Sequence, residues 1–156
     1  MGEGLSHVDE HGDAHMVHVG DKPVTARRAV AEAVVSLSDE VAAALFSGSL
    51  PKGDAIAVVK VAAIMAAKRT SDLVPLCHPI GLDVVDVTID PVAGGARIVV
   101  RCEVSARTGV EMEAMTGAAV GAVALYDMVK GLDRGAEIGP VRLLEKSGGR
   151  SGEWRR

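Results

Sequence analysis

The segment Leu76-Cys77-His78-Pro79 places a thiol beside an imidazole, the two groups that a cysteine nucleophile and its base require. Neighbouring residues of an extended chain point to opposite sides, so we do not expect these two to form a catalytic dyad. A histidine between a thiol and a proline suits a positioned hydrogen-bond donor or acid, and a structural histidine fits the segment about as well.

Acidic side chains that could exchange protons follow in two places. Glu111 and Glu113 share a side if the chain is extended there, whereas about 200° separates them if a helix has begun, so their action as a pair stays open. Asp127 and Lys130 lie one turn apart on a predicted helix, where a surface ion pair is the simplest interpretation.

Cations stand at the end of one predicted helix and near the C-terminus. Lys68-Arg69-Thr70 ends that helix, where positive side chains satisfy terminal carbonyls. The stretch 145–152 combines cations with Gly and Ser, as phosphate-holding loops do, but it lacks the Walker spacing and is weak support for phosphate binding by itself.

Four histidines, His7, His11, His15 and His18, lie in the first 20 residues, and the first three would share one face of a helix, as zinc ligands do. Interspersed glycines lower the stability of such a helix, and no acidic partners for the imidazoles are identifiable. We therefore expect solvated histidines on a flexible arm over residues 1–20, and no metal site.

The composition predicts a core of small side chains, because the 156 residues include 23 Ala and 24 Val but one each of Phe, Trp and Tyr. Small side chains bury little area, so we expect contacts between subunits to add apolar burial. The scarcity of aromatic residues and a net charge of −4 argue against a nucleic-acid partner.

The sequence also predicts a cytoplasmic protein without a membrane partner. The N-terminus has no apolar stretch typical of a secretory signal, and the longest apolar run, residues 114–126, is shorter than a membrane span. Cys77 and Cys102 form neither a CxxC pair nor a metal-binding spacing, which suits a reducing compartment.

Several elements must position these side chains. The run 25–37 is ambiguous between strand and helix, residues 39–46 form a short helix that stops at Gly48, and residues 55–70 form a second helix. Residues 83–90 and 97–105 alternate as two antiparallel strands around Gly94-Gly95. The longest helix covers 113–132, and a last strand at 141–144 precedes a flexible tail at 146–156. This pattern predicts an α+β fold in one domain over 21–156.

Six segments, in order, resemble the molybdenum cofactor biosynthesis protein C (MoaC) family, the cyclic pyranopterin monophosphate synthases. They are HMVHV, KGD at 52–54, AAKRTSDLVPLCHP at 66–79, TGVEMEAMT at 108–116, YDMVKGLD at 126–133 and VRLLEKSGGRSG at 141–152. The resemblance implies a ferredoxin-like subunit, with an antiparallel sheet and helices on one face. It further implies a homohexamer built as a trimer of dimers, with the active site at the dimer interface.

The implied reaction converts (8S)-3′,8-cyclo-7,8-dihydroguanosine 5′-triphosphate to cyclic pyranopterin monophosphate and diphosphate. A radical-SAM GTP cyclase would supply this substrate. The resemblance implies no cofactor, and the need for a divalent ion stays open.

Carried over by motif, Asp127 is the catalytic acid or base, supported by Lys52, Lys130 and Lys146. The implied substrate-binding residues are Arg27, Lys68, Leu76, Cys77, His78, Glu111, Met112, Glu113 and Arg150. The chain departs from the family pattern at His18, where the family usually has Asp, and at Arg150, where it usually has Lys. Arginine keeps the charge but replaces a point ammonium with a planar fork.

The residues support this chemistry independently of the family name. A triphosphate carries about four negative charges, so an acidic protein must gather cations locally to bind it. Two other functions stay compatible with the sequence. A non-enzymatic nucleotide-binding protein would need the cations but not Asp127, and a metal-dependent hydrolase would use the carboxylates and the histidine arm.

Overall fold

The central strand of the sheet is β1 (Thr25–Ser36), the segment whose sequence is compatible with both strand and helix. It pairs antiparallel with β3 (Gly95–Ala106) on one side and with β4 (Glu137–Ser147) on the other. Pairing on both edges selects the extended state, because every backbone polar group of a central strand then finds a partner.

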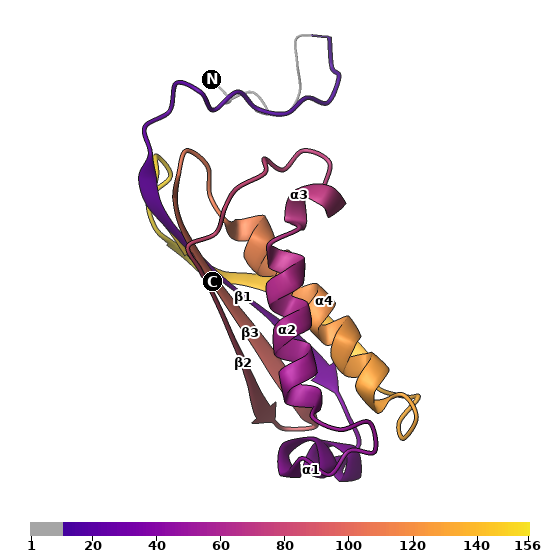
Figure 1. Cartoon of the computed structure of the whole chain (residues 1–156). Coiled ribbons are helices and arrows are strands. Elements are labelled where there is room, and N and C mark those ends of the chain that lie inside the picture. Colours follow the sequence, from indigo (N-terminus) through magenta and orange to yellow (C-terminus); the bar gives the residue numbers. More distant parts are fainter. Residues whose placement is uncertain (1–10) are drawn as a thin grey trace.

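The computed structural model describes residues 11–156, and its remaining elements are α1 (Asp39–Ser47), α2 (Ala55–Ala67), α3 (Thr70–Leu73), β2 (Val84–Val92), α4 (Glu111–Val129) and β5 (Trp154–Arg155). The sheet has the strand order β2-β3-β1-β4-β5, with every pair antiparallel. Figure 1 shows α2 and α4 side by side over one face of this sheet. The predicted α+β fold is confirmed, and the order β1, α2, β2, β3, α4, β4 is the ferredoxin-like arrangement.

Small side chains allow α4 to lie close to α2 and to the sheet. A Cβ atom added at Gly117 would lie 3.1 Å from the carbonyl oxygen of Ala63 on α2, and one at Gly121 would lie 3.3 Å from the Ala63 Cβ. Ala118 and Ala122, on the same helix, are fully buried. The predicted core of small residues is therefore confirmed.

The two longest helices differ at their ends from the prediction. The helix predicted for 55–70 ends at Ala67, and a separate turn, α3, begins at Thr70. The buried Thr70 hydroxyl donates to the carbonyls of Ala66 (3.4 Å) and Ala67 (3.0 Å), so the side chain satisfies groups at the end of α2. The long helix begins at Glu111 and ends at Val129 rather than covering 113–132.

The last strand is longer than the predicted 141–144, because β1 pairs with β4 from Glu137 to Ser147, with two register shifts on the way. The chain then turns back, and Trp154 and Arg155 of β5 pair with Lys146 and Glu145 of β4. Strand pairing thus includes Lys146 and residues 154–155, while the flexibility expected for the tail at 146–156 stays a prediction.

The face of the sheet away from α2 and α4 carries charged side chains that pair with one another. Glu32, which is 3% exposed, accepts hydrogen bonds from Arg97 and from Arg142 (2.6 Å). Burial acts to raise the pKa of Glu32, but the two arginines outweigh it and lower the pKa. Arg28 and Arg101 on this face are likewise paired with carboxylates.

Candidate active site

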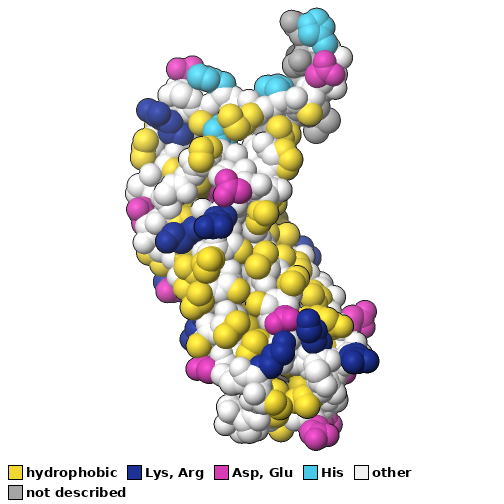
Figure 2. All heavy atoms as spheres, turned by 45° about the vertical axis from the view of Figure 1, so that its right-hand side comes forward, with side chains coloured by type: hydrophobic (Ala, Val, Ile, Leu, Met, Phe, Trp, Pro, Cys, Tyr) yellow, Lys and Arg dark blue, Asp and Glu magenta, His cyan; other side chains and the backbone are white. Residues whose placement is uncertain are grey.

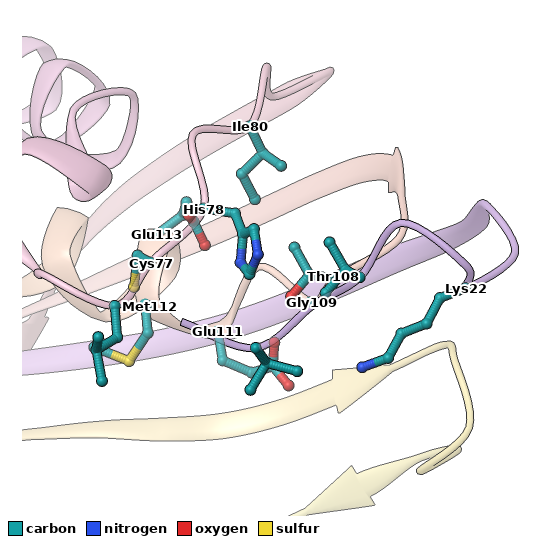
Figure 3. Close-up of a pocket in the computed structure, with 12 residues that line it drawn as sticks. Lys22, Cys77, His78, Ile80, Thr108, Gly109, Glu111, Met112 and Glu113 are labelled. Carbon is teal, nitrogen blue, oxygen red and sulfur yellow. The ribbon is translucent and has the colours of Figure 1, made fainter. Parts of the chain in front are cut away.

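A pocket of about 260 Å³, here called the inner pocket, opens where the start of α4 meets the loop after α3. Its walls come from residues 17–22 of the N-terminal segment, from the loop at 76–80 and from residues 108–113 (Figure 3). The backbone N–H of Cys77 donates to the Val74 carbonyl (3.1 Å), and Pro79 favours an extended residue before it. This turn presents Cys77 and His78 to the cavity.

Glu113 is the buried carboxyl of the inner pocket, with 5% of its surface exposed. Burial raises the pKa of Glu113 to about 7, and the negative charge of Glu111 adds to the rise, against a backbone hydrogen bond that lowers it. A carboxyl with this pKa exchanges its proton close to neutral pH, as a general acid or base must.

The thiol of Cys77 is held in its neutral form. Burial raises the pKa of Cys77, and the nearby Glu113 raises it further. Since the thiolate is the nucleophilic form of cysteine, this environment disfavours Cys77 as a nucleophile.

Glu111 and Glu113 point in different directions because α4 has already begun at Glu111. Glu113 lies in the core, whereas Glu111 is half-buried and its carboxylate lies 3.4 Å from Nζ of Lys146 on β4. Gly109 leaves the room for this, since a Cβ there would lie 1.9 Å from Oε2 of Glu111. Of the two arrangements that the sequence left open, the structure shows the helical one, in which Glu111 turns to Lys146 while its charge still raises the pKa of Glu113.

A second cavity of about 660 Å³, here called the basic pocket, adjoins the inner pocket and shares Lys22, Thr108, Gly109 and Glu111 with it. Its cationic lining residues gather at one end of the sheet, where β1 begins, β3 and β4 end and the β4–β5 turn lies, and they are Lys22, Arg27, Arg107, Lys146 and Arg150.

The cations of the basic pocket differ from those on the open sheet face. Within the described part of the chain, no carboxylate forms an ion pair with Lys22, Arg27, Arg107 or Arg150. Only Lys146 has such a partner, Glu111. Positive charge that the protein itself leaves unneutralised favours an anionic ligand.

At the other end of α4, Asp127 forms an acid–lysine cluster with Lys52 and Lys130. Its two carboxylate oxygens lie 3.1 Å from Nζ of Lys52 and 2.7 Å from Nζ of Lys130. The hydrogen bonds from Lys130 and Lys52 lower the pKa of Asp127, which is 57% exposed, so the carboxylate is ionised at neutral pH. The expected pair of Asp127 and Lys130 is present, and Lys52 joins it.

The expected site residues therefore lie in two places. The inner pocket brings together Leu76, Cys77, His78, Glu111, Met112 and Glu113, and the basic pocket brings together Arg27, Glu111, Lys146 and Arg150. Neither pocket is lined by Asp127, Lys52, Lys130 or Lys68. Glu113 and Asp127 are 14 residues apart on α4, which is about 21 Å along the helix axis.

Several lining residues had not been expected from the sequence, namely Val17, Val19, Lys22, Ile80, Arg107 and Thr108. For Arg107 a signal existed, since it directly precedes the TGVEMEAMT segment. No sequence signal pointed to Lys22, because it reaches the edge of the pockets only through the folded course of residues 11–24.

The histidine arm is only partly described. His7 lies outside the described residues, and His18 places Nε2 3.4 Å from Oδ2 of Asp21. Over residues 11–156, no group of three or more His, Cys, Asp or Glu side chains is arranged to hold a metal ion. The same residues include no helix with the length and apolar character of a membrane span.

Residues 16–149 match the model of the MoaC family. Three curated relatives from Brucella ovis, Brucella melitensis biotype 2 and Brucella abortus (strain 2308) carry the name cyclic pyranopterin monophosphate synthase. Each is 50% identical over 152 residues, which covers 96% of this chain and 92% of the relative. The family model covers the inner pocket, the acid–lysine cluster and all of the basic pocket except Arg150 and Ser151, and the chain therefore belongs to the MoaC family.

Proposed function

We propose that this chain, a cyclic pyranopterin monophosphate synthase of molybdenum cofactor biosynthesis, holds the triphosphate of cyclised dihydroguanosine triphosphate in its basic pocket. The main support is that four cations of this pocket form no ion pair with a carboxylate of the described residues. They are Lys22, Arg27, Arg107 and Arg150. Five positive side chains and one carboxylate leave a surplus of positive charge that matches the roughly four negative charges of a triphosphate.

The position of the two pockets suits a ligand with a polar ring system and a phosphate tail. The inner pocket adjoins the basic pocket and offers Glu113 and His78 for proton exchange with the rings. In the proposed reaction a hydroxyl of the substrate attacks the α-phosphorus, and the bond to the leaving diphosphate breaks. Fixed cations around that diphosphate stabilise the charge that develops on it.

The acid–lysine cluster reaches this substrate only from a second copy of the chain. Val58, Val61 and Met65 on α2 and Val123 on α4 are each about half exposed, and Figure 2 shows hydrophobic side chains along this face with charged groups near its lower end. Two copies packed antiparallel through these helices would set Asp127 of one copy beside Glu113 of the other. Such a face, unpartnered in one subunit, is typical of an interface.

From the family resemblance we extend this dimer to a hexamer, a trimer of dimers, located in the cytoplasm and supplied with substrate by a radical-SAM GTP cyclase. A protein that merely stored the nucleotide would need the basic pocket but not Asp127. The role of Asp127 therefore separates an enzyme from a binding protein.

Asp127→Asn should lower the rate of diphosphate release by about 10²–10⁴, because the substitution removes a general acid or base without changing the size of the side chain. Release from the cyclised substrate measures the effect, and Asp39→Asn on α1 serves as the remote control. The melting temperature should stay that of the wild type, since Asp127 is exposed. A rate within threefold of wild type would contradict the proposal and show that Asp127 serves only in a surface ion pair.

Mixing the Asp127→Asn and Glu113→Gln variants should restore activity if the site uses two chains. Each mixed dimer then has one site with both wild-type residues, so random exchange should give about a quarter of wild-type activity. Subunit exchange is verified with differently tagged chains. No recovery despite exchange would place both groups in one chain's site.

Lys146→Ala should weaken diphosphate binding strongly, whereas Arg150→Lys should have a small effect because it keeps the charge. Lys146 lies deeper in the basic pocket, next to Glu111, and its side chain is 23% exposed. Titration with inorganic pyrophosphate measures both. An unaffected Lys146→Ala variant would show that the phosphates bind elsewhere.

The stability of the wild type, relative to Glu113→Gln, should fall as the pH rises from about 4.5 to about 7. Folding raises the pKa of Glu113 from 4.5 to about 7, so the folded protein holds the proton more tightly than the unfolded chain in this window, and that advantage disappears above it. The loss should approach about 3 kcal/mol. Urea unfolding of both proteins at pH 4.5, 6 and 8 measures it, and a constant difference between them would mean that Glu113 titrates normally.

A further inference from the structure

The turn between β4 and β5 runs against β1 at two consecutive glycines. Gly148 and Gly149 have φ values of +97° and +73°, a backbone region that suits glycine. A Cβ atom at Gly148 would lie 2.1 Å from the backbone oxygen of Ala26, whereas one at Gly149 would lie 1.6 Å from Nη1 of Arg27. The missing side chain of Gly148 thus lets the backbone of β1 approach closely, and that of Gly149 leaves space for the side chain of Arg27.

Arg27 occupies the space that Gly149 leaves. Its Nη2 donates to the carbonyl of Arg107 (3.4 Å), and its buried Nε has no hydrogen-bond partner among the described residues. No carboxylate of residues 11–156 neutralises this guanidinium, although Arg28, the next residue along β1, is paired with Glu145. The guanidinium therefore lies between the turn and the end of β3, where packing against Gly149 and one hydrogen bond position it without an ion pair. Arg27 also lines the basic pocket.

We propose that Gly149 is a positioning residue, which holds the Arg27 guanidinium at the wall of the basic pocket so that it binds the phosphates of the ligand. A methyl group at position 149 would overlap the guanidinium and displace it, since the end of an arginine moves more easily than the paired backbone of β1 and β4. That the pocket binds an anionic ligand rests on the proposed function. The role of Gly149 rests on the close approach of the Arg27 guanidinium to its Cα.

Gly152 provides a matched control in the same turn. Its φ of +64° is close to that of Gly149, so alanine at either position has a similar backbone cost. A Cβ at Gly152 would meet nothing within 4 Å. The two alanine variants therefore differ in whether the new methyl group meets Arg27.

The experiment titrates inorganic pyrophosphate into the full-length protein by calorimetry. The intrinsic fluorescence of Trp154, the single tryptophan, follows the same binding, because this residue pairs with Lys146 across β4 and β5. Gly149→Ala should weaken binding about tenfold, the loss of one charge-assisted contact, and Gly152→Ala by less than twofold. The melting temperatures of the two variants should be equal.

A double-mutant cycle tests whether Gly149 acts through Arg27. In an Arg27→Ala background, adding Gly149→Ala should change the pyrophosphate affinity by less than twofold, because the guanidinium is already gone. Equal weakening by Gly149→Ala with and without Arg27 would overturn the proposal and leave Gly149 as a turn residue. Equal pyrophosphate affinities of the Gly149→Ala and Gly152→Ala variants would overturn it as well.

The failure of the proposed function has a different signature. If neither Arg27→Ala nor Lys146→Ala weakens pyrophosphate binding, the basic pocket does not bind phosphate, and both proposals fall. If both of these variants weaken binding while Gly149→Ala does not, the pocket keeps its function and only the positioning role is rejected.

Discussion

The close packing of α4 on α2 and on the sheet is the constraint on which the rest of the molecule depends. At Gly117 and Gly121 the helix approaches its neighbours so closely that an added Cβ would meet them at 3.1 to 3.3 Å. A continuous helix held in this way keeps Glu113 in the core at one end and Asp127 exposed to water at the other. The same rigidity that buries one acid separates it from the second, and this separation is why the proposed site needs two chains.

The distribution of paired and unpaired charge distinguishes the two sides of the sheet. On the open face, Arg97 and Arg142 converge on the buried Glu32, an arrangement in which the charges satisfy each other. In the basic pocket, Lys146 is the one lining cation, among the described residues, whose charge a carboxylate neutralises. Folding thus neutralises the charges on the open face but leaves the cations of the basic pocket unpaired. These cations repel one another, and an anionic ligand would remove that repulsion.

The sequence predicted the hairpin of β2 and β3 and the helical character of α2 and α4, because their patterns are local. It left β1 ambiguous, since its extended state is selected by partners far along the chain, and it missed β5 for the same reason. The family resemblance named nine of the twenty residues that line the two pockets. It could not show that Lys22 lies in the same pocket as Glu113, because such a neighbourhood arises from tertiary structure.

Glu111 belongs to the walls of both pockets and touches Lys146, a cation of only one of them. Under the proposed function, phosphates bound in the basic pocket compete with Glu111 for Lys146, and the carboxylate that they release also lines the inner pocket. Phosphate binding would thereby change the charge at the wall of the inner pocket, and any such effect of one pocket on the other has the same size in both directions. In the proposed complex, Glu111 at the first position of α4 is the side chain through which the two pockets influence each other.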